Sequence, residues 1–314
     1  MAEATATAAT QISTHRPRTR PRMKVASVIA TLPMIIIAFS VFFVAILFTI
    51  YWSFTSSGMF PGWTWVGLKQ YNILWGTNNW QISVSNIFVF GAASLVINLV
   101  VGYVLAVFMD QNIKLESLFR SIFLYPFAMS LYVTGLAWQW ILDPNLGFQN
   151  AMQNFGFTDF RFSPLSNPNQ AMVGLILGGC WQGAGVTMAI MLAGIRGIDA
   201  EIWKAAKIDG IPTWRTYVSI VLPSMRGALA TAIILQVTGI VRTFDLVISM
   251  TGGGPGIATW MPAMYVINAI QSKLNVGQGS AAATMMLAPI AVLLLIMAIF
   301  NWRKARLAGK NVTT

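Results

Sequence analysis

Charged residues are scarce in this 314-residue chain, where Asp, Glu, Lys and Arg make up 9% and hydrophobic residues 56%. A water-soluble domain carries roughly a quarter charged residues, so this sequence predicts a polytopic membrane protein. The single cysteine, Cys180, excludes a disulfide within the chain, and with the single histidine, His15, it leaves no His and Cys ligand set for a metal site. The phosphate-binding pattern G-x-x-x-x-G-K-[ST] is also absent. We therefore expect no metal cofactor on this chain and no ATP hydrolysis by this chain alone.

Six long apolar segments dominate the sequence. They predict transmembrane helices over residues 25–51, 86–109, 118–142, 170–195, 227–250 and 279–302. The first follows a basic segment, as in a signal peptide, but at roughly 27 residues it exceeds a signal-peptide core and predicts a retained span. Pro126 is expected to bend the third span. The predicted fold class is an all-α polytopic membrane protein with six transmembrane helices, between a disordered basic tail at 1–24 and a basic tail at 303–314.

Positive charge is concentrated in alternate loops. Sixteen of the 20 Lys and Arg residues lie in the two tails and in the loops 110–120 and 196–226. The three intervening loops hold one each, and Arg242 lies within the fifth predicted span. Because cytoplasmic loops are enriched in Lys and Arg, both termini and the loop 196–226 are expected in the cytoplasm. The net charge of +11 thus reflects contact with membrane lipid and does not indicate a nucleic-acid partner.

The loop between the fourth and fifth predicted spans contains a helix signal. Asp199 can cap a helix with its carboxylate. Gly210 can end it, because glycine readily adopts a left-handed backbone. Ala205 and Ala206 give this helix a nearly flat face beside Trp203, where a partner protein could approach closely.

A second short helix is predicted after this one. Thr213 is expected to cap it and Pro223 to end it. Taken alone, these residues are equally compatible with an ordinary soluble loop with fraying helices.

One pattern extends over the whole loop, 199–223. It consists of Glu201, Ala205-Ala206, Asp209-Gly210 and, after nine intervening residues, Ile220-x-Leu222-Pro223. This pattern resembles the cytoplasmic coupling loop of the membrane subunits of binding-protein-dependent ABC importers with the type I fold. The resemblance implies that the loop inserts into a cleft on a cytoplasmic ATPase, which carries the ATP and Mg. The residues that it implies in ATPase coupling are Glu201, Trp203, Ala205, Ala206, Asp209 and Gly210.

Other segments resemble the carbohydrate branch of these importers. They are Phe244-Asp245, the turn Thr251-Gly-Gly-Gly-Pro-Gly256 and, as in glucose/mannose-type permeases, Met109-Asp-Gln111, Leu124-Tyr-Pro126, Val133-Thr-Gly135 and Trp138. The resemblance implies a permease subunit of an ATP-driven sugar importer, for a monosaccharide such as glucose or mannose or another small saccharide or polyol. The implied partners are a second homologous permease subunit, two ATPase subunits and a periplasmic or extracellular sugar-binding protein. The implied location is a bacterial cytoplasmic (inner) membrane.

Polar residues inside the predicted spans are candidates for the substrate path, because such groups usually face protein or water rather than lipid. Arg242 and Asp245 lie three residues apart and are expected on one helix face. They either form an ion pair that locks the fifth span to a neighbour or bind sugar hydroxyls. Gln236 lies about 120° from that face on a straight helix. The other candidates are Asn98, Trp138, Trp181 and Gln182. Each of these could instead form an interhelical hydrogen bond or an interface anchor.

Two other classes of protein are considered. An ion-gradient-driven secondary transporter is expected to show internal repeats and ionisable residues at mid-membrane. We find no convincing repeat, and Arg242 and Asp245 are the charged residues deep within predicted spans. A membrane-anchored scaffold would need neither the polar fifth span nor the loop 199–223.

Overall fold

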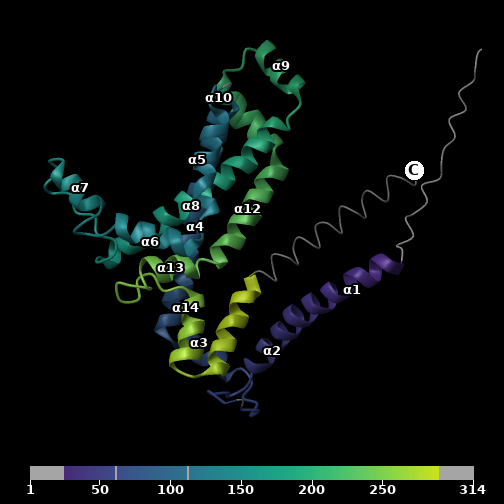
Figure 1. The fold of residues 1–314 in the computed structure, drawn as a ribbon, viewed down its shortest axis with the longest axis vertical. Helices are drawn as coiled ribbons and strands as arrows, with labels where there is room; N and C mark the ends of the chain where they lie inside the picture. Colours follow the sequence, from purple (N-terminus) through teal and green to yellow (C-terminus); the bar gives the residue numbers. More distant parts are fainter. Residues whose placement is uncertain (1–24, 61, 112, 290–314) are drawn as a thin grey trace, which may run out of the picture. The chain divides into compact units, whose positions relative to one another are not determined.

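The computed structural model describes residues 25–60, 62–111 and 113–289, and the regular secondary structure of this part of the chain is helical (Figure 1). Within it, the exception is an isolated antiparallel bridge between Thr55 and Trp65. The chain divides into two compact units, residues 1–48 and 49–314. The predicted tails and residues 290–302 of the sixth predicted span lie outside the described residues.

The first unit contains an apolar helical segment. α1 (Val25–Phe39) continues through a π-helical turn, η1 (Ser40–Val44), into α2 (Ala45–Trp52), which ends beyond the unit. From Thr31 to Trp52 the mean hydropathy is 2.7, and none of the side chains there is buried. A helix that is apolar on all sides is suited to lipid and not to water. This segment is therefore long and apolar enough to cross a membrane.

The second unit is built on two long helices, α4 (Asn78–Asp110) and α8 (Pro168–Arg196), which pack against each other. Glycine allows their close approach. A Cβ on Gly102 of α4 would lie 2.6 Å from Cγ2 of Thr187 on α8, and one on Gly179 of α8 would lie 2.9 Å from Phe90 on α4. Close packing at small residues stabilises helix pairs in lipid, where the hydrophobic effect does not drive association.

Two of the predicted spans are interrupted. The third contains α5 (Glu116–Ala128) and α6 (Leu131–Ile141), which meet at 99°. The expected bend thus occurs, at a break that begins three residues after Pro126 and is far sharper than one proline requires. The fifth contains α12 (Arg226–Val241) and α13 (Phe244–Met250), separated by two non-helical residues.

Several described helices could cross a membrane by length and composition. Three could do so alone, namely Thr31–Trp52, α4 and α8. The number is up to five if each of two bent pairs forms one span, the pairs being α5 with α6 and Thr213–Ser224 with α12. The sixth predicted span begins within a helix at 276–289 that runs to the edge of the described residues. The count of six spans therefore stays a prediction.

Short helices lie at the ends of the long ones. Figure 1 shows α9 (Ala200–Ile208) and α10 (Thr213–Arg215) at one end of α4 and α8. At the other end lie α3 (Lys69–Gly76), α14 (Pro262–Ile267) and the π-helical turn η3 (Asn268–Ser272), while α7 (Phe148–Asn154) projects to one side. The segment between the glycine-rich turn and α14 is hydrogen bonded to α4, because Asn86 Nδ2 donates to the carbonyls of Ala258 and Trp260.

Candidate functional site

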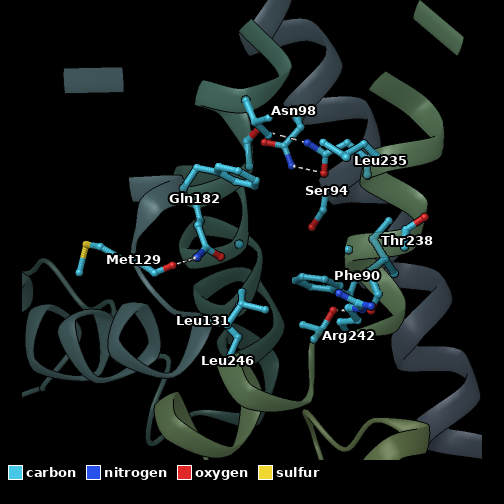
Figure 2. Close-up of a pocket in the computed structure, with 18 residues that line it drawn as sticks. Phe90, Ser94, Asn98, Met129, Leu131, Gln182, Leu235, Thr238, Arg242 and Leu246 are labelled. Carbon is cyan, nitrogen blue, oxygen red and sulfur yellow. Dashed lines mark hydrogen bonds between the residues drawn. The ribbon is translucent and has the colours of Figure 1, made fainter. Parts of the chain in front are cut away.

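A cavity of about 420 Å³ opens between α4, α8 and α12 (Figure 2). The breaks after α5 and α12 contribute to its wall, so the interruptions of both helices help to form it. Its lining combines amides, hydroxyls and one guanidinium with aromatic and aliphatic side chains. The residues that carry this chemistry are Phe90, Ser94, Asn98, Phe127, Leu131, Gln182, Leu235, Gln236, Thr238, Arg242 and Leu246.

A group of buried, hydrogen-bonded side chains links α4, α8 and α12 at the cavity. Asn98 Nδ2 on α4 donates to Gln236 Oε1 on α12 at 3.3 Å. Gln236 Nε2 donates to the Thr187 hydroxyl at 2.6 Å and to the Gly183 carbonyl at 3.2 Å, both on α8. Asn98 is 2% exposed, and its Oδ1 has no hydrogen-bond partner among the described residues. A buried acceptor without a partner is costly, and here it belongs to a residue that lines a cavity.

Gln182 and Arg242 occupy other parts of the same wall. Gln182 Nε2 donates to the carbonyl of Met129, which lies in the break between α5 and α6 (Figure 2). Arg242 is exposed and lies in the break between α12 and α13, where its backbone N–H donates to the carbonyl of Gly239. It is the one charged residue among the described residues that line the cavity.

The expected helix face shared by Arg242 and Asp245 is not found. α12 ends at Val241, and Asp245 lies in the first turn of α13, so the chain is not one continuous helix between them. The ion pairs within the described residues are Arg120–Glu116, Arg196–Asp110 and Arg196–Glu116, so Arg242 and Asp245 do not pair. The prediction of one helix face was wrong because the helix breaks between these two residues, which the spacing alone did not reveal.

The two predicted tryptophans lie beside each other and not on the cavity wall. The rings of Trp138 and Trp181 meet edge to face, with centroids 6.2 Å apart. Trp138 also packs against Gly178, where a Cβ would lie 3.4 Å from the indole, an ordinary van der Waals distance. The structure thus brings Asn98, Gln182, Gln236 and Arg242 around one cavity, whereas Asp245 and both tryptophans are not among the residues that line it.

The predicted first helix of the loop 199–223 is α9. The Asp199 carboxylate caps it by accepting from the Glu201 N–H at 3.0 Å. Gly210 follows it with φ +67°, a left-handed backbone that favours glycine. Thr213 does not cap the second helix as expected. It is the first residue of α10, after Pro212, which offers no side-chain acceptor.

The second helix of the loop also differs from the prediction in its form. After α10 the chain forms a π-helical segment, η2 (Thr216–Val221), and then α11 (Leu222–Ser224). Pro223 lies at the second position of α11, one residue before its end, and α12 then leaves at 75°.

The flat face expected on α9 is divided between the inside and the outside of the protein. Ala206 is 4% exposed, and Trp203 packs on the hydrophobic cluster that contains Tyr217. Glu201, Ala205, Asp209 and Gly210, in contrast, are exposed, so a partner could reach these four but not Ala206. Two further exposed residues were missed, Ile208 (85%) and Trp214 (70%). Both side chains are large and apolar, but the loop contains other large apolar residues, such as Ile202 and Val218, so the sequence did not single these two out.

Comparisons with known proteins extend over most of the chain. Residues 98–310 match the family described as binding-protein-dependent transport system inner membrane component. The chain is similar to a probable ABC transporter permease protein of Pyrococcus horikoshii, at 33% identity over 277 residues, 86% of this chain and 92% of that relative. It is also similar to the xylose/arabinose import permease protein XacH of Haloferax volcanii, at 27% identity over 248 residues, 76% of this chain and 73% of that relative.

A solved structure has a similar fold. It is that of a bacterial ABC transporter involved in the import of the acidic polysaccharide alginate, with a TM-score of 0.74 at 19% identity. The match covers 89% of this chain and 96% of that one.

Proposed function

Because this chain belongs to the family of binding-protein-dependent transport system inner membrane components, we propose that it forms half of the translocation pore of an ATP-driven sugar importer. Membership makes it a non-catalytic, multi-pass subunit of the inner membrane that works with a binding protein. The family binds no cofactor, and the ATP is held by a partner subunit. The predicted all-α importer fold is confirmed by the likeness to the alginate transporter.

The cavity is the observation that carries the proposal of a sugar path. Amide and hydroxyl groups can bind sugar hydroxyls, and Phe90 and Phe127 offer rings to the apolar face of a sugar. A volume of about 420 Å³ lies in the lower part of the range of small-molecule sites. We infer a small saccharide or polyol, such as glucose or mannose. The Haloferax relative, named for xylose and arabinose, agrees with a substrate of this size.

A second permease subunit is proposed to complete the pore beside α12. This helix exposes one side, on which Thr231, Thr238 and Gly239 lie together with Ile234 and Leu235. A Cβ on Gly239 would meet no atom within 4 Å, so space for a neighbour exists there. The threonines and the glycine of this face are suited to close contact with another helix.

The loop 199–223 is proposed to bind one of two cytoplasmic ATPase subunits. Its exposed residues Glu201, Ala205, Asp209 and Gly210 would contact the ATPase, and Trp203 and Ala206 would fix α9 on the membrane helices. Both termini are then in the cytoplasm, in agreement with the distribution of Lys and Arg. Closure of the ATPases on binding ATP would move α9 and switch the pore from an inward-open to an outward-open state. ATP hydrolysis would return the pore to the inward-open state.

Affinity purification from the native membrane tests this proposal. We expect an ATPase, a second permease and a sugar-binding protein to accompany the chain, and the ligand of the binding protein names the sugar. In proteoliposomes, uptake should need ATP inside and the binding protein outside. Sugar or ion flux by the chain alone, driven by an ion gradient without ATP, would contradict the proposal and favour a secondary transporter.

A further inference from the structure

Two residues that flank α9, Arg196 and Tyr217, contact the same carboxylate. Asp110 is the last residue of α4, and its Oδ2 accepts a hydrogen bond from the Tyr217 hydroxyl at 2.8 Å. Its Oδ1 lies 3.8 Å from Nε of Arg196, the last residue of α8. Arg196 precedes α9 and Tyr217 follows it, so the segment 197–216 projects from two points that contact the same side chain.

Arg196 extends this contact to α5. Its Nη1 lies 2.8 Å from Oε1 of Glu116, the first residue of α5, and Arg120 pairs with the same oxygen at 2.7 Å. We refer to Asp110, Glu116, Arg196 and Tyr217 as the loop-root cluster. It joins the ends of three membrane helices to η2, and therefore to both ends of the projecting segment.

Asp110 is not expected to stabilise α4 itself. A carboxylate at the C-terminus of a helix is opposed by the negative end of the helix dipole. The Asp110 side chain is also only 19% exposed, and a charge with little access to water needs partners. Arg196 and Tyr217 supply those partners. Their contacts therefore stabilise a carboxylate that would otherwise be unfavourable at this position.

Tyr217 also contacts α9. Its ring meets that of Trp203 edge to face, with centroids 5.2 Å apart. Its hydroxyl accepts from Gln111 Nε2 at 3.1 Å, and its backbone carbonyl accepts from the hydroxyl of Tyr103 on α4 at 2.8 Å. It lies in the π-helical η2, and π-helical turns frequently occur at functional sites. A displacement of α9 therefore reaches α4 through Trp203 and Tyr217.

We propose that Tyr217 and Asp110 are positioning residues that couple ATP hydrolysis to transport. They fix the angle at which the loop leaves the membrane helices, so that displacement of α9 moves α4 and not the loop alone. This inference rests on the proposed function, since α9 must bind an ATPase. The inference assigns a function in coupling to Asp110 at the end of α4, a residue that is not part of the sequence pattern of the loop 199–223.

The test uses the complete complex in proteoliposomes. Tyr217→Phe removes the hydroxyl and keeps the ring against Trp203. We expect the ATPases to remain associated, because the exposed face of α9 is unchanged. The number of sugar molecules transported per ATP should fall roughly tenfold, the effect expected from the loss of one charge-assisted hydrogen bond. The matched control is Tyr125→Phe, at an exposed tyrosine of α5, which should leave this ratio unchanged.

A second variant tests whether the two residues act through one contact. Asp110→Leu removes the acceptor of the Tyr217 hydroxyl together with the charge that faces Arg196. The double variant should be no worse than the more affected single variant. Normal transport per ATP in Tyr217→Phe overturns the inference, as do additive effects or the loss of ATPase association in that variant. Failure of the unmodified chain to associate with any ATPase overturns the proposed function instead.

Discussion

Asn98 and Gln236 are 138 residues apart in the sequence, yet their side chains are hydrogen bonded between α4 and α12 at 3.3 Å. Both are buried, and Gln236 also bonds to two groups of α8. Gly183 allows this approach, because a Cβ there would lie 2.7 Å from Asn98 Nδ2. The contact fixes the wall of the cavity and leaves the Oδ1 of Asn98 without a partner among the described residues.

Replacing Asn98 with leucine should lower sugar uptake. Asn98→Leu removes the donor to Gln236 and the acceptor at the cavity, and the loss of a buried hydrogen-bond partner costs about 1–3 kcal/mol. We expect either the apparent KM for the loaded binding protein to rise roughly tenfold or the uptake rate to fall roughly tenfold. The complex should still assemble. The control is Val96→Leu, on the exposed side of α4. Equal uptake by the two variants would contradict a substrate role for Asn98.

The roles of Arg242 and Asp245 should separate on mutation. They do not pair, and only Arg242 lines the cavity. Arg242→Gln should therefore reduce uptake several-fold, whereas Asp245→Asn should have little effect. Uptake by the double variant, measured in proteoliposomes, should equal that of Arg242→Gln. A similar loss in both single variants, with no further loss in the double variant, would instead indicate a functional pair in the assembled complex.

Local signals in the sequence predicted local structure well. The carboxylate of Asp199 caps α9, and Gly210 has the left-handed backbone expected at the end of that helix. These outcomes depend on a few neighbouring residues, so the sequence contains what decides them. The polar residues Asn98, Gln182 and Gln236 were likewise predicted to avoid lipid, because an unpaired amide in a membrane is costly, and all three line the cavity.

Features that depend on tertiary packing were not predictable in this way. Which face of α9 points outward depends on Trp203 packing against Tyr217, from the far side of the loop. The break at Arg242 follows no proline and no strong local signal within the fifth predicted span. The contact of Asp110 with both ends of the loop also joins distant parts of the chain. Spacing along a single helix carries no information about such contacts.

Neighbouring alanines of α9 should respond differently to the same substitution. Ala206 is buried and Ala205 is exposed. Ala206→Asp places a charge at a buried position and should lower the thermal unfolding temperature of the purified chain. Ala205→Asp should leave that temperature unchanged and weaken binding of the ATPase, roughly tenfold in Kd. The opposite order of effects would mean that α9 presents its other face to the ATPase.

The exposed apolar residues of the loop should contribute to ATPase binding. Ile208 is 85% exposed and Trp214 is 70% exposed, at the end of the long helices where α9 lies. Burial of such a side chain at an interface stabilises a complex by about 1.5–3 kcal/mol. Ile208→Ser or Trp214→Ser should therefore weaken association with the ATPase at least roughly tenfold, measured as Kd in detergent.

A matched control is available for these two substitutions. Leu146 is 86% exposed and lies in a loop predicted to be outside. Leu146→Ser removes a similar apolar area but should leave ATPase binding unchanged, because the ATPase is in the cytoplasm. If Ile208→Ser and Leu146→Ser bind the ATPase equally well, Ile208 lies outside the interface, and Glu201, Ala205 and Asp209 would have to supply the contact on α9.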